Sequence, residues 1–180
     1  MTRHIALLRG VNLGSHRRVS MPELRELLGR AGFEEVRTYV QSGNVVLSSA
    51  LAGEQLARAC ERAIAEQLGL EVEVVVRTRD ELAEVVRRDP LGRVATNPKR
   101  YQVTFLAAEP PAAVAAKLDA LDCEPEQYAL CGRELYSWHP DGVGRSKLWA
   151  RLAKDGWLGV TATARNWTTA TTLLNMADER

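Results

Sequence analysis

The chain has 180 residues, of which 46% are hydrophobic and 26% are charged, which is typical of a globular protein and excludes a disordered one. Its net charge of +1 argues against a dedicated nucleic-acid binder, which usually carries a strong basic excess. No apolar run approaches the roughly 20 residues that span a membrane. The N-terminus lacks a signal-peptide pattern and the three cysteines form no C-x-x-C pair, so we expect a cytoplasmic protein without membrane contact.

The start of the chain predicts a strand followed by a helix. The strand runs from His4 to about Val11, with apolar residues on both faces. The helix begins at Ser20, because Ser20 and Glu23 have the spacing of a capping box and Pro22 lies in the first turn. Its apolar residues recur at helical spacing, which predicts one buried face.

The remainder of the first half predicts a hairpin, a helix, a strand and a short helix. Residues 33–49 alternate as a hairpin does, with its turn at Ser42-Gly43. A helix follows, and Cys60 lies on its apolar face, where we expect it to be part of the core. After a valine-rich strand, Thr78 and Glu81 form a second capping box. Residues 1–90 thus have the order β-α-β-β-α-β plus a helix.

The second half repeats this order after a linker. Residues 89–100 contain two prolines and a glycine with little periodicity, which indicates a linker between domains at residues 91–100. Residues 101–180 then predict strand, helix, hairpin, helix, short strand and closing helix. The sequence therefore predicts an α+β protein of two ferredoxin-like (βαββαβ) subdomains.

Six stretches of the chain carry a family resemblance. In order, they are LLRGVNLG (7–14), MPELRELL (21–28), TYVQSGNVVL (38–47), VTFL (103–106), GVGRSKL (142–148) and TARNWTTATTLL (163–174). Through these stretches the chain resembles a family catalogued as a domain of unknown function, DUF1697. The resemblance implies two ferredoxin-like subdomains and no particular activity, and it supplies no catalytic residues.

A glycine-spaced turn after the first strand is one candidate binding site. In Arg9-Gly10-Val11-Asn12-Leu13-Gly14, backbone N–H groups and the nearby Arg17 and Arg18 side chains can face an anion. The spacing matches neither common phosphate-binding glycine motif, and Gly14 lies six residues before the Ser20 cap. The alternative is a tight turn with positive φ at a glycine and Asn12 bonded to local backbone.

The stronger candidate is Gly142-Val143-Gly144-Arg145-Ser146-Lys147. Its two glycines lead into a helix that Ser146 can cap, with Arg145 and Lys147 as cationic donors. The alternative is an ordinary capped helix start with a solvated basic turn. Arg165 and Asn166 are further candidates, together with Arg9, Gly10 and Asn12.

Other features of the sequence favour structural roles. Asn166 is placed as an N-cap, and we expect Trp167 to bury its ring rather than stack on a base. The three histidines show no metal-ligand spacing, no G-x-S-x-G motif occurs, and no cofactor or metal is predicted. The two central strands of the first half lack the aromatic residues of an RNA-binding RRM sheet.

Three classes of function remain open from the sequence. The leading hypothesis is a protein that binds a small anionic ligand, bearing a phosphate or being a nucleotide, at Gly/Arg-rich loops. A cofactor-free enzyme in a cleft between the subdomains and a protein-interaction module are the alternatives. We expect no tight binding to generic RNA or duplex DNA at physiological salt. Neither an enzymatic reaction nor an oligomeric state is indicated.

Overall fold

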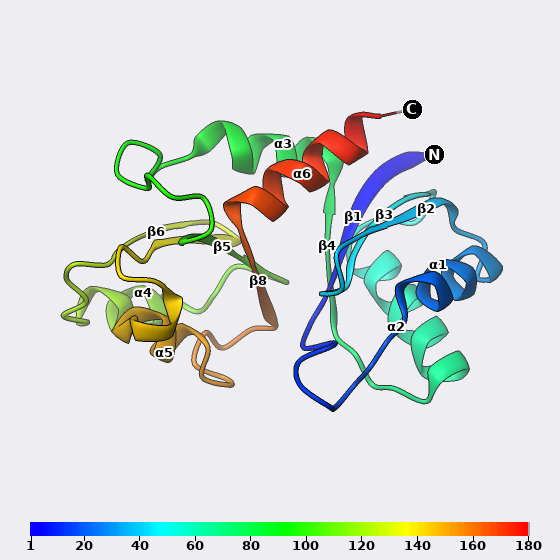
Figure 1. Ribbon diagram of the computed structural model, residues 1–180, viewed down its shortest axis with the longest axis horizontal. Helices are drawn as coiled ribbons and strands as arrows, with labels where there is room; N and C mark the ends of the chain where they lie inside the picture. The colour runs from blue at the N-terminus through cyan, green and yellow to red at the C-terminus, as the bar shows by residue number, and fades with distance from the viewer. Residues whose placement is uncertain (180) are drawn as a thin grey trace. The chain divides into compact units, whose positions relative to one another are not determined.

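A computed structural model describes residues 1–179 of the chain (Figure 1). The chain divides into two compact units, one of residues 1–86 with residues 171–179, the other of residues 87–170. The division falls within the helices α3 (Arg79–Arg88) and α6 (Trp167–Asp178). No helix of the described chain has the length and apolar character needed to cross a membrane.

The first unit contains a four-stranded antiparallel sheet in the order β2-β3-β1-β4. The hairpin strands β2 and β3 lie on one side of β1, and β4 pairs with the other side of β1, which is the ferredoxin-like arrangement. Helices α1 and α2 lie together on one face of this sheet (Figure 1). Before α3 the elements are β1 (Thr2–Leu8), α1 (Met21–Arg30), β2 (Glu34–Tyr39), β3 (Asn44–Ser49), α2 (Gly53–Leu68) and β4 (Val74–Thr78).

The second unit repeats this topology with the sheet order β6-β7-β5-β8, again antiparallel throughout. The predicted α+β fold of two ferredoxin-like subdomains is thereby confirmed. A short 3₁₀ helix, η1 (Val143–Arg145), precedes the second helix of the repeat. The elements before α6 are β5 (Tyr101–Leu106), α4 (Ala112–Asp119), β6 (Gln127–Cys131), β7 (Glu134–Trp138), α5 (Lys147–Leu152) and β8 (Ala162–Asn166).

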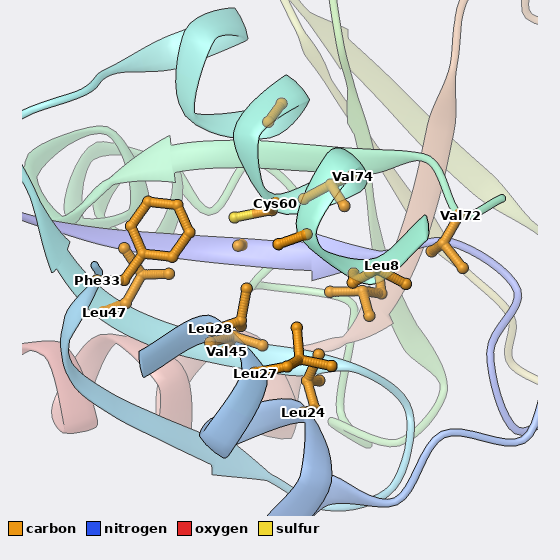
Figure 2. Packing of buried hydrophobic residues seen from close by; sticks show 14 of the residues in the cluster. Leu8, Leu24, Leu27, Leu28, Phe33, Val45, Leu47, Cys60, Val72 and Val74 are labelled. Atoms are coloured by element: carbon orange, nitrogen blue, oxygen red, sulfur yellow. The ribbon is translucent and has the colours of Figure 1, made fainter. Parts of the chain in front are cut away.

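The core of the first unit lies between its sheet and the two helices. Leu24, Leu27 and Leu28 of α1 pack toward Val45 and Leu47 of β3 (Figure 2). These side chains are almost fully buried, and each such burial stabilises the fold by about 1.5–3 kcal/mol before entropy is counted. The expected core position of Cys60 is confirmed, and burial raises the pKa of its thiol to about 12. Cys60 therefore stays neutral.

The two predicted capping boxes differ in the structure. Thr78 Oγ1 accepts from the N–H of Glu81 at 3.1 Å, and Glu81 Oε2 accepts from the N–H of Thr78 at 2.8 Å, so that box is confirmed. The box predicted at Ser20 is wrong, since Ser20 occupies the N-cap position of α1 but its side chain makes no capping hydrogen bond. Pro22 removes one of the two N–H groups that an N-cap side chain can accept from.

The C-terminal turn of α6 is held to the first unit by arginines. Arg37 Nη1 lies 2.8 Å from Glu179 Oε2, and Arg79 Nε lies 2.6 Å from Asp178 Oδ1. The pKa of Arg79 is raised, first by its hydrogen bond to Asp178. These ion pairs explain why residues 171–179 belong to the first unit, whose sheet comes from the start of the chain.

Candidate functional site

The loop of residues 9–18, which joins β1 to α1, is pinned by Asn12. Asn12 Nδ2 donates to the carbonyl oxygens of Val19 at 2.9 Å and of Gln41 at 2.6 Å, and its Oδ1 accepts from the N–H of Val19 at 2.8 Å. Gly10 has a φ of +67°. The side chain of Asn12 thus bonds the local backbone, as the turn interpretation of this segment predicts.

The same loop places Arg17 in an unusual backbone conformation. Its φ is +51°, in the left-handed region where a non-glycine residue is strained by about 1–3 kcal/mol. The N–H of Asn12 donates to the carbonyl oxygen of Arg17 at 3.1 Å, which closes the loop. A side chain at position 10 would place its Cβ 3.9 Å from Arg17 Nη1. The guanidinium of Arg17 therefore lies next to Gly10.

Arg17 lines a pocket of about 670 Å³ within the first unit, here called the arginine pocket. It is formed by the 9–18 loop, the outer face of α2 and the segment that enters β4. Charged side chains dominate its wall. They are four arginines (Arg9, Arg17, Arg58 and Arg62) and three glutamates (Glu61, Glu71 and Glu73), with Ala65 and Val72 beside them.

Some of the charges in the arginine pocket are already paired. Arg9 Nη1 lies 2.5 Å from Glu73 Oε2, and the N–H of Arg9 donates to the carbonyl oxygen of Glu73 at 2.9 Å. Arg58 Nε donates to Glu54 Oε1 at 3.0 Å, and that bond is the first cause of a raised Arg58 pKa. Glu61 Oε1 accepts from the N–H of Val74 at 2.9 Å.

Two guanidinium groups of the pocket remain without a partner. Among residues 1–179, the side chains of Arg17 and Arg62 make no hydrogen bond or ion pair. Both residues are exposed at the surface. The pocket thus offers two free planar donors close to an ordered ion pair between Arg9 and Glu73.

In the 142–147 turn, the leading candidate in the sequence, the Ser146 side chain and the backbone N–H of Lys147 have partners within the protein. Ser146 caps α5, since its Oγ accepts from the N–H of Trp149 at 2.9 Å, as predicted. The N–H of Lys147 donates to Oε1 of Glu126 at 3.1 Å, so a carboxylate of the chain lies at the start of this helix. Gly142 and Gly144 flank the start of η1, and Arg145 is exposed at its end.

Ser146 also belongs to a buried network around His139, which sequence reasoning missed. His139 Nδ1 lies 2.7 Å from Ser146 Oγ, and Nε2 lies 2.8 Å from Ser137 Oγ. The rings of His139 and Trp149 are nearly perpendicular, with centroids 5.6 Å apart. Burial lowers the pKa of His139 to about 4, so the imidazole is neutral at pH 7. The spacing of residues 137, 139 and 146 gives no recognisable motif.

Arg165 and Asn166 also have partners within the chain. Arg165 is buried, and burial lowers its pKa to about 10. Its Nη1 donates to Thr163 Oγ1 at 2.7 Å and to the carbonyl oxygen of Ala164 at 2.8 Å. Asn166 Oδ1 accepts from the N–H of Thr169 at 2.8 Å, which confirms the predicted N-cap. Trp167 stacks on Tyr101 with ring centroids 4.7 Å apart. These contacts favour structural roles.

Of the predicted residues, Arg9 lines this pocket, Gly10 lies next to Arg17, and Asn12 instead bonds the backbone of Val19 and Gln41. Arg58 and Arg62 complete that pocket, and sequence reasoning missed them because they lie on the solvent face of a helix with ordinary amphipathic spacing. Within residues 1–179, no group of three or more His, Cys, Asp or Glu side chains is arranged to hold a metal ion.

Comparisons with known proteins support the family resemblance and the fold. A family model described as "Protein of unknown function (DUF1697)" matches residues 1–136, which include four of the six resembling stretches. No curated protein matches the chain. A solved structure, the conserved bacterial protein SP0830 from Streptococcus pneumoniae, is similar with a TM-score of 0.80 and 22% sequence identity. The match covers 98% of this chain and 99% of that one, which establishes the shared fold.

Proposed function

The chain belongs to the DUF1697 family, and we propose that it binds a small phosphate-bearing ligand in the arginine pocket of its first unit. The observation that supports this most directly is the pair of unpartnered guanidinium groups, Arg17 and Arg62, on the wall of one pocket. A guanidinium presents its N–H donors in a planar fork that matches the oxygen atoms of a phosphate or carboxylate.

The position of Arg17 supports binding rather than solvation. A solvated arginine needs no particular backbone conformation, whereas Arg17 is held at positive φ by a loop that Asn12 ties to Val19 and Gln41. Strained positions persist only where the surrounding structure determines them, and they are common at binding sites. The loop thus presents Arg17 in advance of the ligand, which reduces the entropy lost on binding.

The glutamates of the pocket restrict the class of ligand. Glu71 is exposed and makes no hydrogen bond or ion pair within the described chain, so it repels a second phosphate and accepts hydrogen bonds from hydroxyl or amino groups. A phosphate monoester that carries hydroxyl groups, such as a sugar phosphate or a nucleoside monophosphate, can bind both sets of side chains. Its phosphate accepts hydrogen bonds from the arginines, and its hydroxyl groups donate to the glutamates. Inorganic polyphosphates satisfy only the arginines.

The 142–147 turn is a less favourable place for this ligand. Its first helical N–H, at Lys147, already donates to Glu126, and an entering phosphate would have to displace that buried carboxylate. The helix that follows has only six residues, so its dipole offers little further attraction. We therefore place the phosphate ester in the arginine pocket.

A thermal-shift screen tests this proposal, because a ligand that prefers the folded state raises the melting temperature. The probes are ribose 5-phosphate, adenosine 5′-monophosphate, inorganic phosphate and unphosphorylated ribose. We expect the two esters to stabilise the wild type, ribose to have no effect, and the double variant R17Q/R62Q to lose the response. R18Q is the matched control, since Arg18 follows Arg17 in the loop but does not line the pocket.

The outcomes separate the possible sites. An unchanged ester response in R17Q/R62Q, or an equal loss in R18Q, would place the binding elsewhere and contradict the proposal. Loss of one charge-assisted hydrogen bond of about 1.5–3 kcal/mol weakens binding at least tenfold. Because the double variant loses two such bonds, it should show almost no shift at a ligand concentration about tenfold above the wild-type Kd.

A further inference from the structure

A second pocket, of about 460 Å³, lies in the other unit beside α5, and is called here the α5 pocket. Lys147, Arg151 and Lys154 line it from α5 and the turn that follows this helix. Lys147 and Arg151 are four residues apart, which places them on the same face of the helix. The opposite wall is the segment of residues 120–123 that follows α4.

The charges of the α5 pocket are almost all of one sign. Three cations face one carboxylate, Asp122. Within residues 1–179, none of these four side chains makes a hydrogen bond or an ion pair. The attraction for an anion therefore comes from the side chains, whereas the N–H at the start of α5 is occupied by Glu126.

Apolar residues also line the α5 pocket. Leu148 is buried in the core of the second unit, and Leu121 is packed against that core. Ala120 and Ala150 add small side chains at the entrance, and both are exposed. A ligand in this pocket thus meets both cationic and apolar side chains.

Cys123 contributes to this lining as a neutral thiol. Burial, followed by the charges of Glu126 and Asp122, raises its pKa. Its Sγ lies 3.7 Å from the carbonyl oxygen of Glu126 as a weak donor. Cys123 is therefore a polarisable apolar surface here and not a nucleophile.

We propose that the α5 pocket binds a small amphipathic anion, in which a carboxylate or phosphate head group is attached to a short apolar body. The cations of the pocket hold the head group, and the apolar part of its wall, including Leu121, contacts the body. Burial of apolar surface makes the body necessary for affinity, because exposed cations alone bind a simple anion weakly in salt. This site lies in the other unit and shares no residue with the arginine pocket.

Isothermal titration with a set of matched probes tests both parts of the ligand. Octyl phosphate and octanoate carry head and body, inorganic phosphate and acetate carry the head alone, and octyl glucoside carries the body alone. We expect heat of binding with the first pair only, at concentrations below their micelle formation. Equal binding of acetate or of octyl glucoside would overturn the proposal.

Two independent variants locate the binding. The triple variant K147Q/R151Q/K154Q removes the cations, and A150E introduces an opposing charge at an exposed position of the wall. We expect each to weaken octyl phosphate binding more than tenfold. The controls R145Q and A153E change exposed positions of the same region that do not line the pocket, and they should stay within twofold of the wild type. Unchanged binding in A150E, or equal loss in A153E, would refute the site.

A membrane surface offers the same head-group chemistry, and vesicles distinguish it from a free ligand. Vesicles of phosphatidylglycerol and phosphatidylcholine are compared with monomeric octyl phosphate by sedimentation. Binding of octyl phosphate without vesicle association supports a free amphipathic anion. Association with the anionic vesicles in the absence of octyl phosphate binding would instead overturn the proposal. Neither result depends on ribose 5-phosphate or on Arg17 and Arg62, so the two pockets succeed or fail separately.

Discussion

Glu126 and Lys147 are joined by a hydrogen bond of 3.1 Å from the Lys147 N–H to Glu126 Oε1, although 21 residues separate them. Glu126 is 8% exposed, and its Oε2 is buried without a hydrogen-bond partner in the described chain. The Glu126 carboxylate thus occupies the position at the start of α5 where the sequence predicted an anionic ligand. A negative charge there is favourable, because it lies next to the positive end of the helix.

Glu126→Ala is expected to destabilise the fold. The Lys147 N–H loses its acceptor in a partly buried hydrogen bond, and a donor left without a partner costs about 1–3 kcal/mol. Urea unfolding at pH 7 measures the change. Glu109→Ala, at an exposed position of the same unit, is the control and should change stability by less than about 0.5 kcal/mol. Equal stability of the two variants would contradict a structural role for the bond.

The His139 network predicts a loss of stability in mild acid. The folded-state pKa of about 4 lies below the ordinary value of 6.5, so the unfolded chain takes up a proton first as the pH falls. The stabilisation that neutral His139 gives the fold is fully present above pH 6.5 and is lost as the pH falls toward 4. Over that range the folding equilibrium constant falls by up to about tenfold for each pH unit. Burial lowers the pKa of His4 as well, and it acts in the same direction.

Unfolding curves of the wild type and His139→Gln at pH 7.5 and pH 5 measure this effect. The unfolding free energy of the variant should depend less on pH than that of the wild type, because only one of the two buried imidazoles, that of His4, remains. His16→Gln, at an exposed position, serves as the control and should keep the dependence of the wild type. A His139 variant with the full dependence on pH would show that the proton is taken up elsewhere.

Gly43 and Gly14 form a matched pair for testing close packing. Both have positive φ, at +75° and +67°. A Cβ at position 43 would lie 2.6 Å from Leu8 Cβ and 2.7 Å from Val11 Cγ2, whereas nothing lies within 4 Å at position 14. Gly43→Ala should therefore cost more than about 3 kcal/mol, and Gly14→Ala only the strain of about 1–2 kcal/mol. Similar melting temperatures for the two variants would be incompatible with this packing.

The two capping sequences provide a further comparison. Thr78→Ala should cost about 1 kcal/mol, because its Oγ1 caps α3. Ser20→Ala should cost less than about 0.5 kcal/mol, because Ser20 makes no capping hydrogen bond. Chemical denaturation of both variants measures the difference, and a larger cost at Ser20 would contradict the assignment of the caps.

The features predicted correctly from the sequence are local ones. Apolar periodicity and turn residues such as Ser42-Gly43 predicted the strands and helices. The repeated order of these elements predicted two ferredoxin-like sheets. The caps at Thr78, Ser146 and Asn166 were predicted because an N-cap acts within three residues of itself. The spacing of apolar residues along a segment reflects which face of that segment is buried, so it can be read without knowing the distant contacts.

The features that the sequence did not reveal depend on contacts between distant segments. Arg62 of α2 reaches the same pocket as Arg17 only because the helix packs beside the 9–18 loop. Asp178 meets Arg79 across 99 residues, which draws the end of α6 to the first unit. No local pattern marks either contact, because an exposed arginine and an exposed aspartate have the same appearance in a sequence whether or not they have a partner.

The arginine side chains themselves provide the most direct test of phosphate binding in the first unit. Their Nε–H resonances can be followed by ¹H–¹⁵N NMR while ribose 5-phosphate is added to the full chain, with R17Q and R62Q used for assignment. We predict saturable shifts of Arg17 and Arg62, with Arg18 and Arg145 unchanged. Constant resonances of Arg17 and Arg62 up to millimolar ligand, or shifts centred on Arg145, would contradict a phosphate site in the arginine pocket.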